Sequence, residues 1–222
     1  MSLNMSALKE NLVQAFQSMK DGDDAAFAKK VSEAVANHIK TGNITTVDAG
    51  TVPVGAFAGA GTGTMTVDAS ILEGVLLAAC KSMAAMSVGG DAYLAAQLAA
   101  GMDAMTNAGL IKTMITGAIV TPAGVSVPLA GSGKGKFTGV SAPIIAAVNG
   151  ACSAMETISE GGDSVLAEAI ATSITAYLQS GIITVYGLPP MLACRSSLRP
   201  MCRAVKRSRH FVPTSSLAGR IT

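Results

Sequence analysis

The sequence predicts an α+β protein made of tandem repeats, each a helical hairpin followed by a β-hairpin. Two motifs recur at one interval: Gly-Gly-Asp occurs at 89–91 and 161–163, which is 72 residues later (161 − 89), and a glycine triplet recurs at the same spacing. The helices before these triplets share one apolar pattern. A fixed internal period sets the whole architecture, so we take it as the frame for the remaining residues.

Shifting the chain by 72 residues superimposes residues of several types at once. The matched sets are Gly59, Gly61 and Gly63 on Gly131, Gly133 and Gly135, Cys80 on Cys152, and Met83 on Met155. The second helix of each copy also matches, so that Asp24, Asp91 and Asp163 coincide, as do Gly42, Gly109 and Gly181. We therefore expect a first repeat over 4–67, a second over 68–139 and a partial third over 140–187.

Helix boundaries are predicted from capping residues. Ser70-x-x-Glu73 fits a capping box, in which two side chains satisfy free N–H groups at a helix start. Gly89 and Gly90 are expected to end that helix, because glycine past a helix end adopts the left-handed conformation cheaply. Asp91 is then expected to cap the next helix, which stops near Gly109.

The segments after each helical hairpin are rich in β-branched residues and turn residues, which favour strands joined by turns. We expect strands over 44–47 and 52–54 in the first copy, and over 111–120 and 125–128 in the second, with a turn at 121–124. A Gly-x-Gly-x-Gly strand closes each hairpin. Alternation places the three glycines on one face, where another backbone or a helix can approach closely.

Composition favours a protein that buries its surface in an assembly. Charged residues make up 14% and aromatic residues 4% of the chain, against about 25% charged in an average soluble domain. Membrane contact is the competing interpretation. The start of the chain is an amphipathic helix pattern and not a secretory signal, and no apolar stretch reaches the roughly 20 residues of a spanning helix. Four cysteines in a chain this long do not indicate a disulfide scaffold, so we expect a reducing compartment.

The last segment, 188–222, breaks the repeat. Residues 1–187 contain 9 Lys and Arg and 14 Asp and Glu, a net charge of −5. The tail contains 7 basic residues and no acidic residue. One interpretation is a basic, irregular tail that contacts nucleic acid or an acidic partner. The other is a change of reading frame, which a nucleotide sequence that restores the glycine hairpin in another frame would support.

Motifs that resemble catalytic or binding sites fail on inspection. Lys134 and Lys136 lie in a glycine-rich run, but the phosphate-loop spacing is absent, and the first repeat has Thr62 and Thr64 at the same places. Cys80 and Cys152 are expected to be buried thiols, and the helical methionines are expected to pack in the core. Cys194, Cys202 and His210 do not have the spacing of a zinc site. His38, which matches Met105 and Tyr177, is expected at a half-buried helix position, and Glu33 and Glu168 are expected to be solvated charges. We predict no catalytic residue, cofactor or metal ligand, and hence no enzyme.

The order of a helix ending in glycine, an Ile-x-Thr-Val strand, a proline-containing turn and a glycine-triplet strand resembles small virion structural proteins of tailed bacteriophages. The residues that carry it are Val35–Gly42, Ile44–Val47, Val52–Gly55 and Gly59–Gly63, and again the second copy. The resemblance covers about 1–187 and implies a neck, tail or capsid accessory component, present in the virion and in the host cytoplasm during assembly. It implies homo-oligomers and other virion proteins as partners. The alternative is a membrane-interacting or pore-forming secreted protein.

Overall fold

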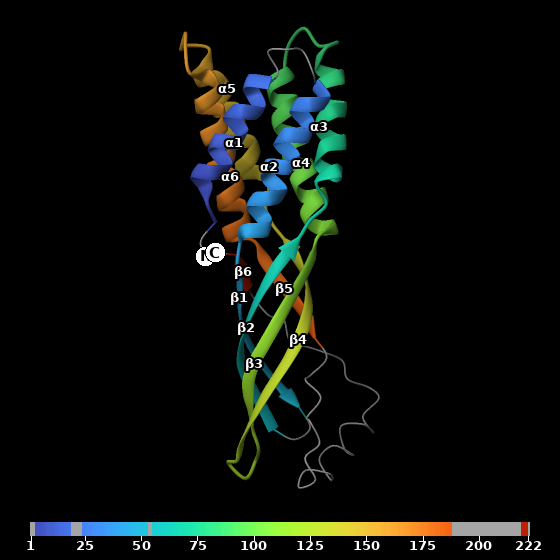
Figure 1. The fold of residues 1–222 in the computed structure, drawn as a ribbon, viewed down its shortest axis with the longest axis vertical. Coiled ribbons are helices and arrows are strands. Elements are labelled where there is room, and N and C mark those ends of the chain that lie inside the picture. Colours follow the sequence, from blue (N-terminus) through green and yellow to red (C-terminus); the bar gives the residue numbers. More distant parts are fainter. Residues whose placement is uncertain (1–2, 19–23, 53–54, 188–218, 222) are drawn as a thin grey trace.

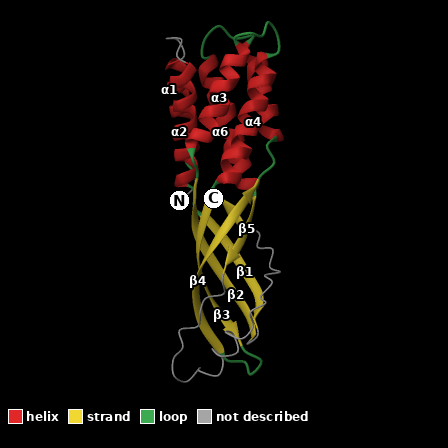
Figure 2. Ribbon diagram, turned by 90° about the vertical axis from the view of Figure 1, so that its right-hand side faces the viewer, coloured by secondary structure: helices red, strands yellow, loops and turns green. Residues whose placement is uncertain are grey.

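A computed structural model of the protein describes residues 3–18, 24–52, 55–187 and 219–221 (Figure 1). A bundle of helices forms one end of the molecule and a long antiparallel sheet forms the other, so the fold is α+β (Figure 2). No helix in the described part of the chain is long and apolar enough to cross a membrane.

The described residues form six helices, which make the bundle: α1 (Met5–Ser18), α2 (Asp24–Thr41), α3 (Ala69–Met83), α4 (Gly90–Ala108), α5 (Ala142–Met155) and α6 (Gly162–Ser180). Each helix packs on the next one in the chain, and α6 packs on α1, so the helices form a closed ring. In α2, Phe27, Val31, Val35 and Ile39 follow a four-residue step and are all buried. This spacing gives a helix one continuous apolar stripe, which faces the bundle core.

The strands are β1 (Ile44–Val52), β2 (Gly55–Thr66), β3 (Leu110–Val120), β4 (Ser126–Thr138), β5 (Ile182–Gly187) and the short β6 (Gly219–Ile221). From β1 to β5, strands that are consecutive in the chain pair antiparallel. The sheet is curled, so that β6 pairs with β1 over three residues. The hairpins are thus also paired to one another, through β2 with β3 and β4 with β5. These edges of β2, β3, β4 and β5 are therefore occupied within the chain.

Glycines line the inside of this curled sheet. In β2 the residues alternate between inward and outward positions, and Gly59, Gly61 and Gly63 share the inward face. A Cβ built on Gly61 would overlap the Thr46 hydroxyl, and one on Gly133 would lie 2.6 Å from Val185 Cγ1 and 2.7 Å from Thr113 Oγ1. The prediction that the three glycines share one face is therefore confirmed for β2. A Cβ would meet backbone atoms of β3 at Gly59 and Gly63, and the Thr46 side chain at Gly61.

Close approach also explains why glycine follows α4 and α6. A Cβ on Gly109 would lie 2.6 Å from Met65 Cε, and one on Gly181 would overlap the ring of Phe137. Met65 and Phe137 are the last buried side chains of β2 and β4. Each glycine therefore makes room for a large side chain where the bundle meets the sheet.

Three predicted helix ends are wrong. Helix α3 ends at Met83, with Ala84 as its C-cap, and not at Gly89 and Gly90. Asp68, and not Ser70, caps α3: its carboxylate accepts hydrogen bonds from the Ser70 N–H (3.0 Å) and hydroxyl (2.8 Å). Helix α4 begins at Gly90, and its N-cap is Gly89 in the left-handed conformation at φ 78°, with no side-chain cap. Asp91 lies one residue inside the helix, where its charge still suits the helix dipole.

The strand boundaries also need correction. One nine-residue strand, β1, runs through 44–47 and on to Val52, while residues 53–54 of the expected second segment lie outside the described part. The glycine triplets lie within β2 and β4 and do not form extra closing strands. The tail expected to be irregular contains β6, and its residues 188–218 lie outside the described part. The predicted first and second repeats each contain two helices and two strands in the same order.

Candidate functional site

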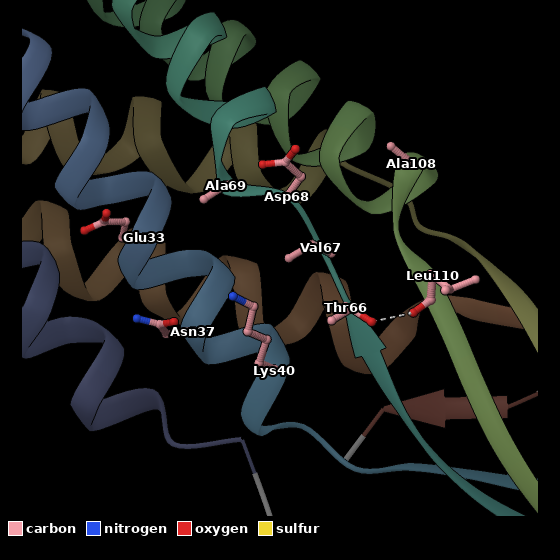
Figure 3. Close-up of a pocket in the computed structure, with 9 residues that line it drawn as sticks. All are labelled: Glu33, Asn37, Lys40, Thr66, Val67, Asp68, Ala69, Ala108 and Leu110. Atoms are coloured by element: carbon pink, nitrogen blue, oxygen red, sulfur yellow. Dashed lines mark hydrogen bonds between the residues drawn. The ribbon is translucent and has the colours of Figure 1, made fainter.

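An open cavity of about 670 Å³ lies at the waist, where the bundle meets the sheet (Figure 3). It is lined by Glu33, Asn37, Lys40, Thr66, Val67, Asp68, Ala69, Ala108 and Leu110. Glu33, Asn37 and Lys40 come from one exposed stripe of α2, as predicted for a solvated Glu33. The opposite wall comes from the segment between β2 and α3 and from the start of β3.

Five of the nine residues that line this cavity are polar or charged. Asp68 already accepts the Ser70 hydroxyl and N–H, and these bonds, with Lys40 nearby, lower its pKa. The Thr66 hydroxyl donates to the Leu110 carbonyl at 3.2 Å, which joins β2 to β3. A reactive site needs a nucleophile within reach of a base that is itself oriented. The lining of this cavity contains no such pair.

A second polar group lies between α4, α6 and the segment before α5. The Tyr177 hydroxyl donates to Asp103 Oδ1 at 2.8 Å and lies 2.8 Å from the Thr106 hydroxyl, while the Ser141 hydroxyl donates to Asp103 Oδ2. Burial, more than the Asp103 charge, raises the pKa of Tyr177, which is 1% exposed. The phenol therefore stays neutral, and the network joins two helices and a linker as a structural clamp.

Sequence reasoning missed this network, although a signal was present. Tyr177 aligns with His38 and Met105 in the repeat frame. A tyrosine at a position that holds methionine in another copy needs a partner for its hydroxyl when it is buried. Asp103, which lies 74 residues before Tyr177 in the chain, provides that partner.

His38 is 5% exposed, so the prediction of a half-buried position is wrong. Its Nε2 lies 3.1 Å from the Thr175 hydroxyl, which also donates to the Ala171 carbonyl. Burial lowers the pKa of His38, partly offset by a hydrogen bond to the Asn4 backbone. The ring is thus neutral at pH 7 and connects α2 to α6.

The remaining residues considered from the sequence are distributed as follows. Lys134 and Lys136 are exposed on the outer face of β4, and Lys134 lies directly opposite Lys112 of β3. A phosphate loop joins a strand to a helix start, whereas these lysines lie within one strand. Glu168 forms an ion pair with Lys9 at 2.7 Å and is therefore more than a solvated charge. Met102 and Met105 are in the core, but Met86 is 41% exposed, which corrects its core assignment.

Cys80 and Cys152 are buried free thiols, as predicted, and burial raises the pKa of each. Cys194, Cys202 and His210 lie outside the described residues. Within the part that the structure describes, no cluster of three or more His, Cys, Asp or Glu side chains is placed to hold a metal ion.

Comparison with known proteins adds no relative: no protein-family model, curated protein or solved structure matches this chain.

Proposed function

We propose that this chain is a structural assembly protein of a bacteriophage virion, a neck, tail or capsid accessory component that acts through subunit packing and not through catalysis. It would self-associate and bind other virion proteins. The proposal includes its architecture: tandem repeats of a helical hairpin followed by a β-hairpin.

The observation that carries this proposal is a set of exposed apolar side chains at matching places in different repeats. Val47 and Met114 match and are 78% and 73% exposed. Met86 (41% exposed) matches Ile158 (40%), and Leu110 (41%) matches Ile182 (58%). Single exposed apolar residues are ordinary, but three matched pairs on the sheet, the waist and the bundle tip indicate a surface that other subunits cover.

Strand register supports the repeat. Gly63 pairs with Thr113, Gly135 with Val185 and Gly219 with Thr46. Gly63 and Gly135 are equivalent in the repeat frame, and so are the partners Thr46, Thr113 and Val185. Gly219 lies in the tail, outside the predicted repeats. Each boundary between hairpins thus has the same register.

The test compares the native mass of the full chain with that of matched variants. Sedimentation velocity at rising concentration is expected to give a defined oligomer, and Val47→Thr with Met114→Thr is expected to shift it toward the monomer. The control is Val140→Thr, because Val140 is 68% exposed but matches Asp68 and not another apolar residue. A wild-type chain that stays monomeric at high concentration would count against the proposal.

A further inference from the structure

Acidic and basic side chains are separated along this chain. Residues 82–111 and 137–187 contain Asp and Glu but no Lys or Arg. Strands β2 to β5 contain three lysines and no acidic residue. The sequence after Glu168 also contains no Asp or Glu, so no side chain of the tail can neutralise these lysines. The molecule therefore has regions of opposite charge.

The three lysines form one patch on the outside of the sheet, which we call the basic face. Lys112 of β3 lies directly opposite Lys134 of β4, and Lys136 follows on the same side of β4. All three are exposed, and the one ion pair among the described residues joins Lys9 to Glu168. Like charges at opposite positions of a sheet repel each other. An acidic surface placed against the basic face would offset this repulsion.

The basic face also contains apolar side chains. Leu110 and Met114 lie on either side of Lys112 on the outer side of β3, and they are 41% and 73% exposed. Protein interfaces combine an apolar centre with charged residues at the rim. Three lysines can neutralise few phosphates, and the net charge of −5 on residues 1–187 opposes the approach of a polyanion. These features favour a protein partner over nucleic acid.

An acidic surface lies at the end of the bundle farthest from the sheet, and we call it the acidic tip (Figure 1). Asp91 is in the first turn of α4, Glu156 is the C-cap of α5, and Glu160 follows in the turn before α6; all three are exposed. Burial and the Asp91 charge raise the pKa of the Cys152 thiol, so Asp91 lies beside α5. Lys81, in the last turn of α3, is on the other side of α4.

The acidic tip of a chain cannot reach the basic face of the same chain. Helix α4 begins at the tip and ends at Ala108, just before β3 and Lys112. Its 19 residues span roughly 28 Å. Contact between the two surfaces therefore requires two copies of the chain.

We propose that the acidic tip of one copy docks on the basic face of a second copy. Ile158 of the tip, which is 40% exposed, would meet the apolar residues of the basic face. This contact specifies how the copies associate in the assembly proposed above, and it rests on that proposal. Because two different surfaces meet, each copy keeps one of them free for the next copy, and the contact generates a ring or a filament.

Charge reversal tests each surface in the full chain. The face variant carries Lys112→Glu and Lys134→Glu, and the tip variant carries Glu156→Lys and Glu160→Lys. Each variant brings like charges together, so sedimentation velocity at low ionic strength is expected to show self-association weakened at least about tenfold. Added salt is expected to weaken the association of the wild-type chain, because it screens exposed charges.

Mixing the two variants tests whether the surfaces contact each other. In the mixture every acidic surface can meet a basic one, so assemblies of wild-type size are expected to return. The chain with all four substitutions is expected to assemble alone for the same reason. The matched control is Lys29→Glu with Lys30→Glu, which makes the same change in net charge on exposed positions of α2, across the ring of helices from α5. This control is expected to assemble like the wild-type chain.

Circular dichroism spectra and melting temperatures show whether each variant keeps the fold. Wild-type assembly by both the face variant and the tip variant, or no recovery on mixing two folded variants, would overturn the proposed contact. So would a face variant that assembles normally but loses binding to a labelled DNA duplex, since the lysines would then serve nucleic acid. These outcomes leave the assembly proposal in place, whereas a wild-type chain that stays monomeric contradicts assembly itself.

Discussion

The bundle and the sheet are stabilised by opposite uses of side-chain size. The bundle core contains large aliphatic residues such as Leu12, Leu72 and Met102, which are fully buried. The inside of the sheet contains glycines, and the side chains of Thr46, Thr113 and Val185 pack against them. The bundle gains stability from apolar burial, whereas the sheet depends on the absence of side chains at defined positions. The same substitution should therefore have opposite effects in the two halves.

The largest effect is expected for Gly117→Ala in β3. A Cβ there would overlap the Ala58 carbonyl and lie 2.6 Å from Gly59 Cα, and backbone atoms of a paired strand cannot move aside. We expect the free energy of unfolding to fall by about 1–3 kcal/mol, measured by urea denaturation. The control is Ala60→Val, which adds volume on the outer face of β2 and should be nearly neutral. Equal losses for the two variants would show that the inside of the sheet is not tightly packed.

The next effect concerns the junction of the two halves. Tyr177→Phe removes the hydroxyl that bonds Asp103 and Thr106. Because the half-buried Asp103 carboxylate loses a donor, we expect a loss of about 1–2 kcal/mol in the free energy of unfolding. Tyr93→Phe in the half-buried part of α4 is the matched control. No difference between them would mean that Asp103 is satisfied by solvent.

Gly74→Ala is expected to raise the free energy of unfolding, whereas Gly117→Ala is expected to lower it. Gly74 is exposed in α3, and a Cβ there would meet no atom within 4 Å. Alanine has the higher helix propensity, so we expect thermal denaturation to show a gain of about 0.5–1 kcal/mol. Destabilisation by this variant would contradict the contrast drawn between the halves.

The smallest effect at pH 7 is expected for His38→Met, which copies the residue found at Met105. Thr175 keeps its bond to Ala171, so the loss of the imidazole leaves the hydroxyl satisfied. Burial holds the pKa of His38 below the 6.5 of the unfolded chain. The unfolded state therefore binds more protons, and wild-type stability falls as the pH is lowered through 6.5. Urea titrations between pH 5 and 8 should show a weaker pH dependence for the variant, and parallel curves would contradict this assignment.

Local sequence rules predicted the elements but not their partners. Apolar periodicity located the helices, and alternation placed the glycines of β2 on one face. The caps at Asp68 and Gly89 were missed because several neighbouring residues can cap a helix, and backbone geometry decides among them. The pairing of β2 with β3, and of Tyr177 with Asp103, joins residues far apart in the chain, so no local pattern specifies it. The waist cavity likewise is lined by residues of five elements, α2, β2, α3, α4 and β3, which lie far apart in the chain.

The first described helix begins, and the last described strand ends, at the same level between the bundle and the sheet (Figures 1 and 2). A short linker between these ends would leave the ring of helices and the ring of strands without an obligatory starting point. New ends opened in the exposed turn between α3 and α4 should then give a circular permutant with the same three-dimensional structure. The order in which the segments are synthesised would change, while the contacts that hold them would not.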